Sequence, residues 1–185
     1  MNEMQCAEFK QAFDEGRLVV YPTEAVMGIG CDPDNHKAVN TLLALKDRPV
    51  EKGMILIADT YSRLLPYVDD SLISLDMRPV IFSSWPGPVT WLLPKSASAP
   101  DWITGGQDKI AVRVTNHPTV IDLCRAAGRP LVSTSANPSG LTPAKSVSEA
   151  KNYFGDNVIY IDGKTGGYNS PSTIRDCASG KVIRA

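Results

Sequence analysis

Three cations lie within seven residues at Lys46, Arg48 and Lys52, between a helical pattern and an apolar run. Lysine offers a compact charge and arginine a planar fork for phosphate oxygens, so the cluster suits a triphosphate. Pro49 would stiffen the turn that carries it. Cations at the carboxyl end of a helix are also favoured by the helix dipole. The residues alone leave a solvated helix end and a phosphate site both open.

Small polar residues crowd the segment 133–140, STSANPSG, after the apolar pair Leu131-Val132. The hydroxyl and amide groups of Ser133, Ser135 and Asn137 are neutral donors and acceptors, and their small size lets a ligand approach the backbone. Asn-Pro and Ser-Gly pairs suit a turn equally well. A ligand-binding strand end and an ordinary turn are therefore both compatible with this segment.

Arg113 interrupts the apolar pattern AVRV, and Thr23 and Glu24 follow another apolar run. An unpaired buried charge is very costly, so Arg113 must either face solvent or be paired, and a carboxylate in a cavity would suit its fork. Strand ends of α/β sheets usually carry ligands, which makes Thr23 a candidate site residue. Thr23 and Glu24 could equally cap a local turn.

Several familiar sites are excluded by spacing. Gly163-Lys164-Thr165 resembles the end of a phosphate-binding P-loop, but position 158 is Val where that motif needs glycine. H-E-x-x-H, G-x-S-x-G and G-x-G-x-x-G do not occur in the sequence, and His36 and His117 are far apart. Nothing therefore favours a Ser-His-Asp hydrolase, and no metal-ligand spacing appears.

Composition indicates one globular domain. The chain has 185 residues, of which 43% are hydrophobic and 21% charged, and its four cysteines form no C-x-x-C pair. The first residues contain no apolar signal region and no stretch is long enough to span a membrane, so we expect a cytoplasmic protein with reduced thiols. With a net charge of -1, any binding of nucleotide or RNA must come from a local cluster.

Helical and strand patterns alternate along the chain. They predict helices over 3–15, 35–46, 69–82, 117–127 and 146–154, and strands over 18–21, 54–58, 89–93, 109–114, 158–162, 172–175 and 181–184 and from residue 131. Alternation favours an α/β domain on one twisted sheet, and Pro/Gly corners between short strands favour mixed pairing. The turn-rich stretch 94–106 could be a mobile flap or a packed loop.

Six ordered segments of this chain resemble the threonylcarbamoyl-adenylate synthase family, the TsaC/YrdC proteins, in their short bacterial form. The segments cover nearly the whole sequence, at 21–33, 45–58, 85–94, 111–118, 130–140 and 169–176. The resemblance implies a single YrdC-like catalytic domain over 1–185. Its fold would be a twisted open mixed sheet flanked by helices around a deep, positively charged cavity.

The resemblance also implies roles for particular residues. The family's KxR and SxN motifs would place four residues at the nucleotide end of one cavity: Lys46, Arg48, Ser135 and Asn137. Further ATP contacts would come from Lys52 and Arg184, and the threonine would be held by Thr23, Arg113, Ser133 and Ser172. Longer relatives carry a threonine-contacting histidine where this chain has Ile57.

The implied reaction joins L-threonine, bicarbonate or CO2, and ATP into threonylcarbamoyl-AMP and pyrophosphate. Because the attacking carboxylate and the triphosphate are both anionic, Lys46 and Arg48 would stabilise developing charge, with Mg²⁺ held through the ATP phosphates. No residue is singled out as a general base. The product would pass to a transferase complex of TsaB, TsaD and TsaE that modifies tRNA adenosine 37.

Two other functions are compatible with the same residues. The cationic cavity could hold tRNA or double-stranded RNA in a non-catalytic or ribosome-maturation protein, although no basic stretch extends beyond 46–52 and no RNP-like aromatic motif is present. A carbamoyl-adenylate module like that of hydrogenase-maturation proteins is the third possibility. The accessory domains expected of that class do not occur in this chain.

Overall fold

The computed structural model describes residues 1–184. These residues form six α-helices: α1 (Glu3–Asp14), α2 (His36–Lys46), α3 (Met77–Ser83), α4 (Asp101–Thr104), α5 (Pro118–Ala127) and α6 (Val147–Phe154). They also form nine strands: β1 (Val19–Pro22), β2 (Met27–Gly30), β3 (Ile55–Ala58), β4 (Val89–Pro94), β5 (Lys109–Val114), β6 (Leu131–Ser135), β7 (Ile159–Tyr160), β8 (Thr173–Asp176) and β9 (Val182–Arg184). Short 3-10 helices cover Val50–Lys52, Tyr61–Arg63, Leu65–Tyr67 and Asp70–Leu72.

The strands lie side by side in the order β7-β1-β2-β6-β3-β5-β4-β8-β9. Three neighbouring pairs are parallel, namely β1 with β7, β3 with β5 and β4 with β8, and the other pairs are antiparallel. The predicted α/β class with one mixed sheet is therefore confirmed. Strand β6, which carries the small polar segment, lies near the middle between β2 and β3.

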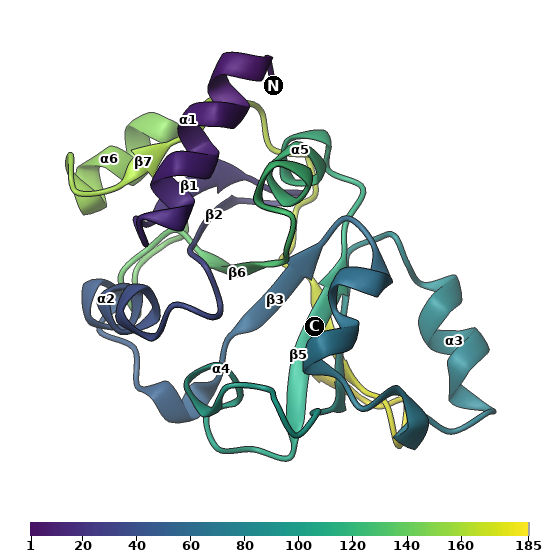
Figure 1. The fold of residues 1–185 in the computed structure, drawn as a ribbon. Helices are drawn as coiled ribbons and strands as arrows, with labels where there is room; N and C mark the ends of the chain where they lie inside the picture. The colour runs from purple at the N-terminus through teal and green to yellow at the C-terminus, as the bar shows by residue number, and fades with distance from the viewer. Residues whose placement is uncertain (185) are drawn as a thin grey trace.

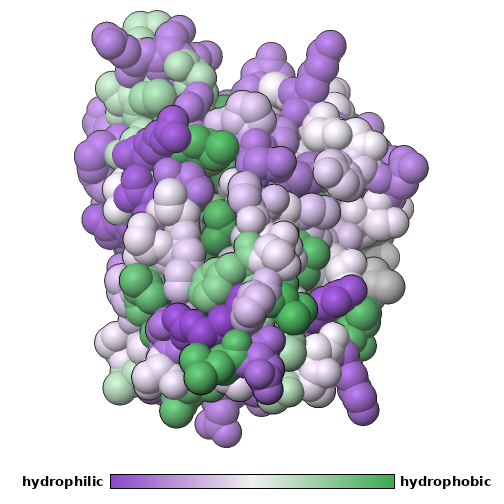
Figure 2. All heavy atoms as spheres, turned by 90° about the vertical axis from the view of Figure 1, so that its right-hand side faces the viewer, coloured by the Kyte–Doolittle hydropathy of each residue, from purple (hydrophilic) through white to green (hydrophobic). Residues whose placement is uncertain are grey.

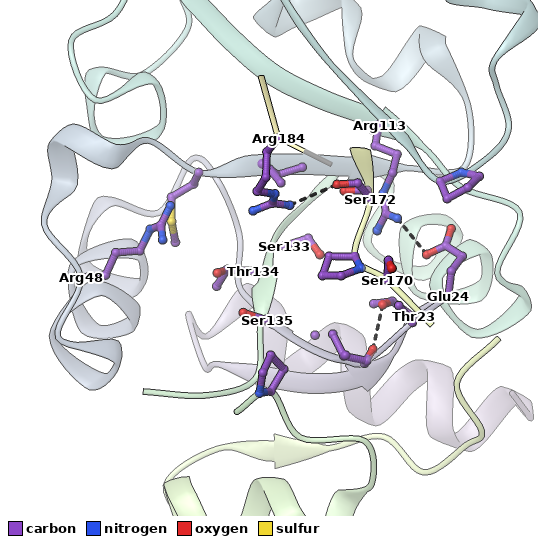
Figure 3. Close-up of a pocket in the computed structure, with 18 residues that line it drawn as sticks. Thr23, Glu24, Arg48, Arg113, Ser133, Thr134, Ser135, Ser170, Ser172 and Arg184 are labelled. Carbon is purple, nitrogen blue, oxygen red and sulfur yellow. Dashed lines mark hydrogen bonds and ion pairs between the residues drawn. The ribbon is translucent and has the colours of Figure 1, made fainter. Parts of the chain in front are cut away.

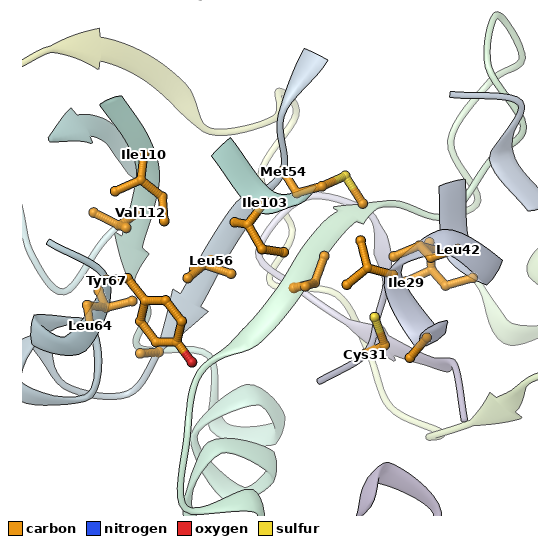
Figure 4. Close-up of a cluster of buried hydrophobic side chains, with 14 of the residues drawn as sticks. Ile29, Cys31, Leu42, Met54, Leu56, Leu64, Tyr67, Ile103, Ile110 and Val112 are labelled. Atoms are coloured by element: carbon orange, nitrogen blue, oxygen red, sulfur yellow. The ribbon is translucent and has the colours of Figure 1, made fainter. Parts of the chain in front are cut away.

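Helices cover both faces of the sheet (Figure 1). On one face, α1 and α5 pack together over an apolar cluster that includes Phe13, Tyr21 and Leu131. The larger cluster on the other face joins residues of β2, α2, β3, α4 and β5, among them Ile29 and Leu56 (Figure 4). Because successive strand residues point to opposite faces, β1, β3 and β6 contribute to both clusters.

Most predicted elements are found within one or two residues of their expected ends. Helix α1 begins with a capping box, in which the Asn2 side chain accepts from Gln5 N and the Gln5 side chain accepts from Asn2 N. The predicted helix over 69–82 is wrong, because this region forms the short helices Asp70–Leu72 and α3 instead. Pro79 lies in the first turn of α3, where its missing N–H is tolerated, but it would break a longer helix.

Strand β2 was missed in the sequence because two of its four residues are glycines, which weaken strand patterns. The glycines are there for close packing. A Cβ on Gly30 would lie 1.7 Å from the carbonyl oxygen of Val132 on β6, and one on Gly28 would lie 3.1 Å from the Tyr21 ring. This close approach lets β2 and β6 pair where the small polar segment begins.

We expect Gly30→Ala to lower the free energy of unfolding by about 3 kcal/mol, because the added methyl group overlaps a backbone oxygen and forces β2 from β6. Urea unfolding followed by circular dichroism measures the change. Gly106→Ala is the matched control, since a methyl group there meets nothing within 4 Å and only the φ of +77° opposes it. The control should cost about 1 kcal/mol, and equal losses in the two variants would contradict the packing argument.

The stretch 94–106 is packed onto the body of the molecule through α4. The Trp102 indole stacks on the His36 ring with 4.3 Å between ring centroids, and its N–H donates to the Pro33 carbonyl at 2.9 Å.

On the α3 side of the molecule, hydrophobic residues reach the surface in groups divided by hydrophilic ones (Figure 2). Leu75, beside α3, is the most exposed of the large apolar side chains among residues 1–184, at 84%.

Candidate functional site

The first candidate cavity lies on the sheet face that α1 and α5 cover only in part. Leu131 and Ser133 point to this face because they are two residues apart, and Leu131 packs under α5. Ser133 of β6 pairs with Ile55 of β3, and Arg113 of β5 pairs with Ile57 of β3. The two polar side chains therefore lie on either side of β3. Beyond the apolar cluster, the same face opens into a cavity of about 160 Å³.

Polar residues from six segments line this first cavity: Thr23, Glu24, Arg48, Arg113, Ser133, Thr134, Ser135, Ser170, Ser172 and Arg184. Arg48 lies at one end and the Glu24–Arg113 pair at the other, with Arg184 between them (Figure 3). Seven of the ten predicted site residues therefore meet in one cavity. Three others, Lys46, Lys52 and Asn137, lie outside its lining.

Arg113 is buried and ion-paired rather than solvent-facing. Its side chain is 8% exposed, and its Nη1 lies 3.0 Å from Glu24 Oε2. The other carboxylate oxygen of Glu24 accepts a hydrogen bond from Thr115 Oγ1 at 2.6 Å, and Thr115 Oγ1 accepts from His117 N. This arrangement resolves the alternatives left open for Arg113, because the face opposite Val112 and Val114 is the cavity.

Arg48 and Arg184 bring two more guanidinium groups to the same cavity. Arg48 Nη2 donates to Gly53 O at 3.0 Å, while its buried Nε has no partner. Burial and the nearby charge of Arg184 lower the pKa of Arg48, and burial and the charge of Arg113 lower the pKa of Arg184. Three arginines are thus held close enough to repel one another. A bound anion would relieve that repulsion.

Lys46 lies directly behind the cavity and is not a solvated helix end. It is 2% exposed, and its ammonium group donates to the backbone carbonyls of Ser135 and Asn137. The chain leaves α2 through Asp47, whose φ of 50° is left-handed and ends the helix directly after Lys46. Burial, followed by the charge of Arg48, lowers the pKa of Lys46 to about 8.

The lowered pKa of Lys46 predicts a stability change with pH. Between pH 8 and the ordinary lysine value of 10.5, the unfolded chain binds more protons than the folded one, so stability should rise with pH in this window. Below pH 8 the full cost of burying the charge is present. We expect the gain from pH 8 to 10 to be about 2 kcal/mol larger than in Lys46→Met. Urea unfolding of both proteins at each pH measures this difference, and parallel curves would contradict it.

The remaining predicted residues are held by local hydrogen bonds. Asn137 shapes its own loop, since its Nδ2 donates to Pro138 O and Leu141 O, and its buried Oδ1 has no partner. Thr23 Oγ1 donates to Val26 O at 2.8 Å, and the Ser172 hydroxyl bonds to that of Thr90 at 2.9 Å. Thr23 and Ser133 both line the cavity, and a hydroxyl oxygen has two lone pairs that can accept hydrogen bonds.

A second cavity of about 490 Å³ adjoins the first and shares Arg48, Arg184, Met54 and Ile55 with it. Lys52 lines this second cavity, together with apolar side chains of Leu92, Ile103, Ala111, Ile174 and Ile183. Ligand sites usually measure about 300–1,000 Å³, so the first cavity suits a ligand of amino-acid size and the second a larger one. The shared arginines lie at the junction.

The segment 163–172 crosses beside Thr23 and Glu24 and then lines the first cavity with Ser170, Pro171 and Ser172. Gly166 N donates to Thr23 O at 2.9 Å and Tyr168 N donates to Glu24 O at 3.0 Å. A Cβ on Gly166 would lie 3.0 Å from the Glu24 Cα, so glycine permits this close crossing. Sequence reasoning singled out Ser172 in this segment but missed the contacts that Gly166 and Tyr168 make with Thr23 and Glu24.

Glu24 and Thr115 were also missed as site residues. Glu24 was treated only as a turn former, although a lone acid next to Thr23 at a strand end was a usable signal. Its partner Arg113 lies on a strand that reaches it only through the fold.

Within residues 1–184, no group of three His, Cys, Asp or Glu side chains could hold a metal ion. The described part of the chain likewise contains no helix that could cross a membrane.

Comparison with known proteins gives a consistent assignment. The family model for Sua5, YciO and YrdC proteins, described as "Telomere recombination", matches residues 11–185. Threonylcarbamoyl-AMP synthase of Pseudoalteromonas atlantica is 61% identical over 91% of this chain and 90% of its own length. The Escherichia coli O1:K1 protein of the same name is 51% identical over 99% of this chain and 98% of its own.

The fold agrees with that assignment. P. abyssi Sua5, solved in complex with L-threonine, superposes with a TM-score of 0.90 at 30% identity. The match covers 98% of this chain but 53% of the Sua5 chain, so the present chain spans about half the length of that relative. By sequence and by fold, the chain belongs to the Sua5/YciO/YrdC family.

Proposed function

We propose that the chain is an enzyme that joins L-threonine, bicarbonate or CO2, and ATP into threonylcarbamoyl-AMP, with release of pyrophosphate. The observation that carries the proposal is the pair of adjoining cavities with three arginines along them. One end offers a buried arginine and small hydroxyl groups for an amino acid, and the junction offers Arg48 and Arg184 for phosphates. Curated relatives that match nearly the whole chain carry the name of this activity.

The threonine would lie in the first cavity. Its carboxylate would pair with Arg113, and its hydroxyl and amine would contact Thr23, Ser133 and Ser172. The triphosphate would lie at the junction against Arg48 and Arg184, with the nucleoside in the second cavity beside Lys52. Lys46 would act from behind Ser135, and Ser135 and Asn137 would shape the wall near the phosphates.

In the reaction, the neutral threonine amine first adds to CO2 with loss of a proton, or to bicarbonate with loss of water, and becomes an N-carboxylate. An oxygen of that carboxylate attacks the α-phosphorus, and pyrophosphate leaves. Negative charge moves from the attacking oxygen toward the departing phosphates, so fixed cations at the junction stabilise the transition state. Mg²⁺ would enter as part of the ATP substrate and neutralise phosphate charge, held by the phosphate oxygens rather than by a protein carboxylate cluster.

The product would serve the modification of tRNA adenosine 37 by a TsaB, TsaD and TsaE transferase complex. A purely RNA-binding role is less well supported. Arg113 is buried and paired, and Lys46 donates to backbone carbonyls behind the cavity, so neither presents its charge to a duplex surface.

Pyrophosphate release by the purified protein tests the proposal. The complete mixture of ATP, L-threonine and bicarbonate should release pyrophosphate, and omission of any one of the three should stop it. The nucleotide product should be retained as an adenylate that contains both threonine and carbonate carbon. Release that is independent of threonine, or salt-sensitive RNA binding without any turnover, would contradict the proposal.

A further inference from the structure

Glu24 is the one carboxylate among the residues that line the first cavity, as far as residues 1–184 describe it. Its side chain is 5% exposed. Oε1 is engaged by the Thr115 hydroxyl at 2.6 Å. Oε2 lies 3.0 Å from Arg113 Nη1 but has no partner with hydrogen-bond geometry, and Arg113 Nε also has none. Each member of this buried ion pair therefore has one polar atom without a hydrogen bond, and both atoms have almost no accessible surface. A ligand in the cavity would reach them once the ion pair separates.

The spacing of this pair matches an amino acid. In a zwitterion the ammonium and carboxylate groups share one carbon, so a site for both needs an anion and a cation side by side. Glu24 and Arg113 provide that arrangement at the end of a cavity of about 160 Å³. A buried unpaired charge is costly, which explains why the two groups pair with each other in the free protein. A bound zwitterion would replace this single ion pair with two. One would join its ammonium group to Glu24, and the other would join its carboxylate to Arg113.

We propose that Glu24 binds the α-ammonium group of the amino-acid substrate while Arg113 binds its carboxylate. The inference rests on the proposed function for the site and assigns to Glu24 a substrate contact of its own. Thr115 holds the Glu24 side chain from behind, and Tyr168 N fixes its backbone from the crossing segment. Oε2 is the atom that would receive the ammonium hydrogen.

A purely structural role makes a different prediction. If Glu24 only orients Arg113, its loss weakens every ligand that uses Arg113. If Glu24 contacts the ammonium group, its loss weakens only ligands that carry one. (R)-3-hydroxybutanoate is L-threonine without its α-amino group, so it keeps the carboxylate and the hydroxyl. Comparing the two ligands in two proteins isolates the ammonium contact.

The experiment is calorimetric titration of wild type and Glu24→Gln with each ligand, in the presence of a non-hydrolysable ATP analogue. Wild type should bind L-threonine at least about tenfold more tightly than the analogue, as expected for one charge-assisted contact. Glu24→Gln should lose most of that preference. Its affinity for the analogue should be equal or higher, because Glu24 no longer competes for Arg113.

Equal weakening of both ligands by Glu24→Gln would overturn the inference and leave the proposed function standing. Failure of wild type to bind L-threonine at all would remove the proposed function before any variant is compared. Glu24→Asp covers the case in which Glu24→Gln does not fold, because it keeps the buried charge but withdraws it by one methylene group. It should lose part of the threonine preference, and an unchanged preference would overturn the inference as well.

Discussion

Replacing Arg48 with alanine should slow threonine-dependent pyrophosphate release by about 10²- to 10³-fold, the usual effect of removing one donor that stabilises transition-state charge. Arg48 stands at the junction of the two cavities, where the phosphates of ATP would lie. Burial and the charge of Arg184 lower the pKa of Arg48, so its positive charge is destabilised in the free protein. A triphosphate supplies the missing partner.

Arg48→Lys separates charge from shape. Lysine keeps the positive charge but not the planar fork, so we expect it to recover only about a tenth of the lost rate. Lys10→Ala removes an exposed cation of α1 far from the cavities and controls for net charge. Initial rates of pyrophosphate release are measured for each of these proteins over a range of ATP concentrations. A rate for Arg48→Ala within threefold of wild type would exclude Arg48 from the reaction.

Local patterns predicted the elements well where the signal lay within a few residues. The helical pattern over 3–15 matches α1, and the strand pattern over 109–114 matches β5. The prediction of one helix over 69–82 was wrong because the apolar residues there follow a helical period that continues on both sides of Pro79. Strand β2 was not predicted because one of its glycines, Gly30, is required by the close approach of Val132, which lies on a strand more than a hundred residues away.

The candidate site depended on contacts that no local pattern contains. The sequence presented Lys46 as a cation at a helix end, which is usually solvated. Only the fold brings Ser135 and Asn137, 89 and 91 residues later, to its ammonium group. Similarly, alternation placed Arg113 opposite its apolar neighbours but could not show whether that face meets solvent or a cavity. Glu24 and the segment 163–172 close that face.

The family resemblance supplied what local reasoning lacked. Each candidate segment, taken alone, fitted a turn or a cap as well as a binding site. Six of them in order pointed to one cavity, and the structure brings Arg48, Ser135 and Arg113 to its lining. The roles of these residues toward ATP and threonine remain predictions of the resemblance and of the geometry. Ile57, which replaces a histidine of longer relatives, is fully buried in the cluster under α5.

Replacing Arg113 with alanine should raise the KM for L-threonine by about 30- to 100-fold, the equivalent of one charged, two-pronged hydrogen-bonded pair. The KM for ATP should change by less than about threefold, because Arg113 lines only the first cavity and ATP would lie mainly at the junction and beyond it. Steady-state rates with each substrate varied in turn measure both constants.

The split between the two KM values is the decisive result, because it separates a threonine contact from general damage. Arg113→Ala leaves Glu24 buried without its ion-pair partner, and breaking a buried pair is destabilising. The double variant Arg113→Ala with Glu24→Gln removes the stranded charge and should recover stability without recovering threonine use. Thermal unfolding monitors the first property and the KM the second. If threonine use returned together with stability, Arg113 would serve the fold and not the substrate.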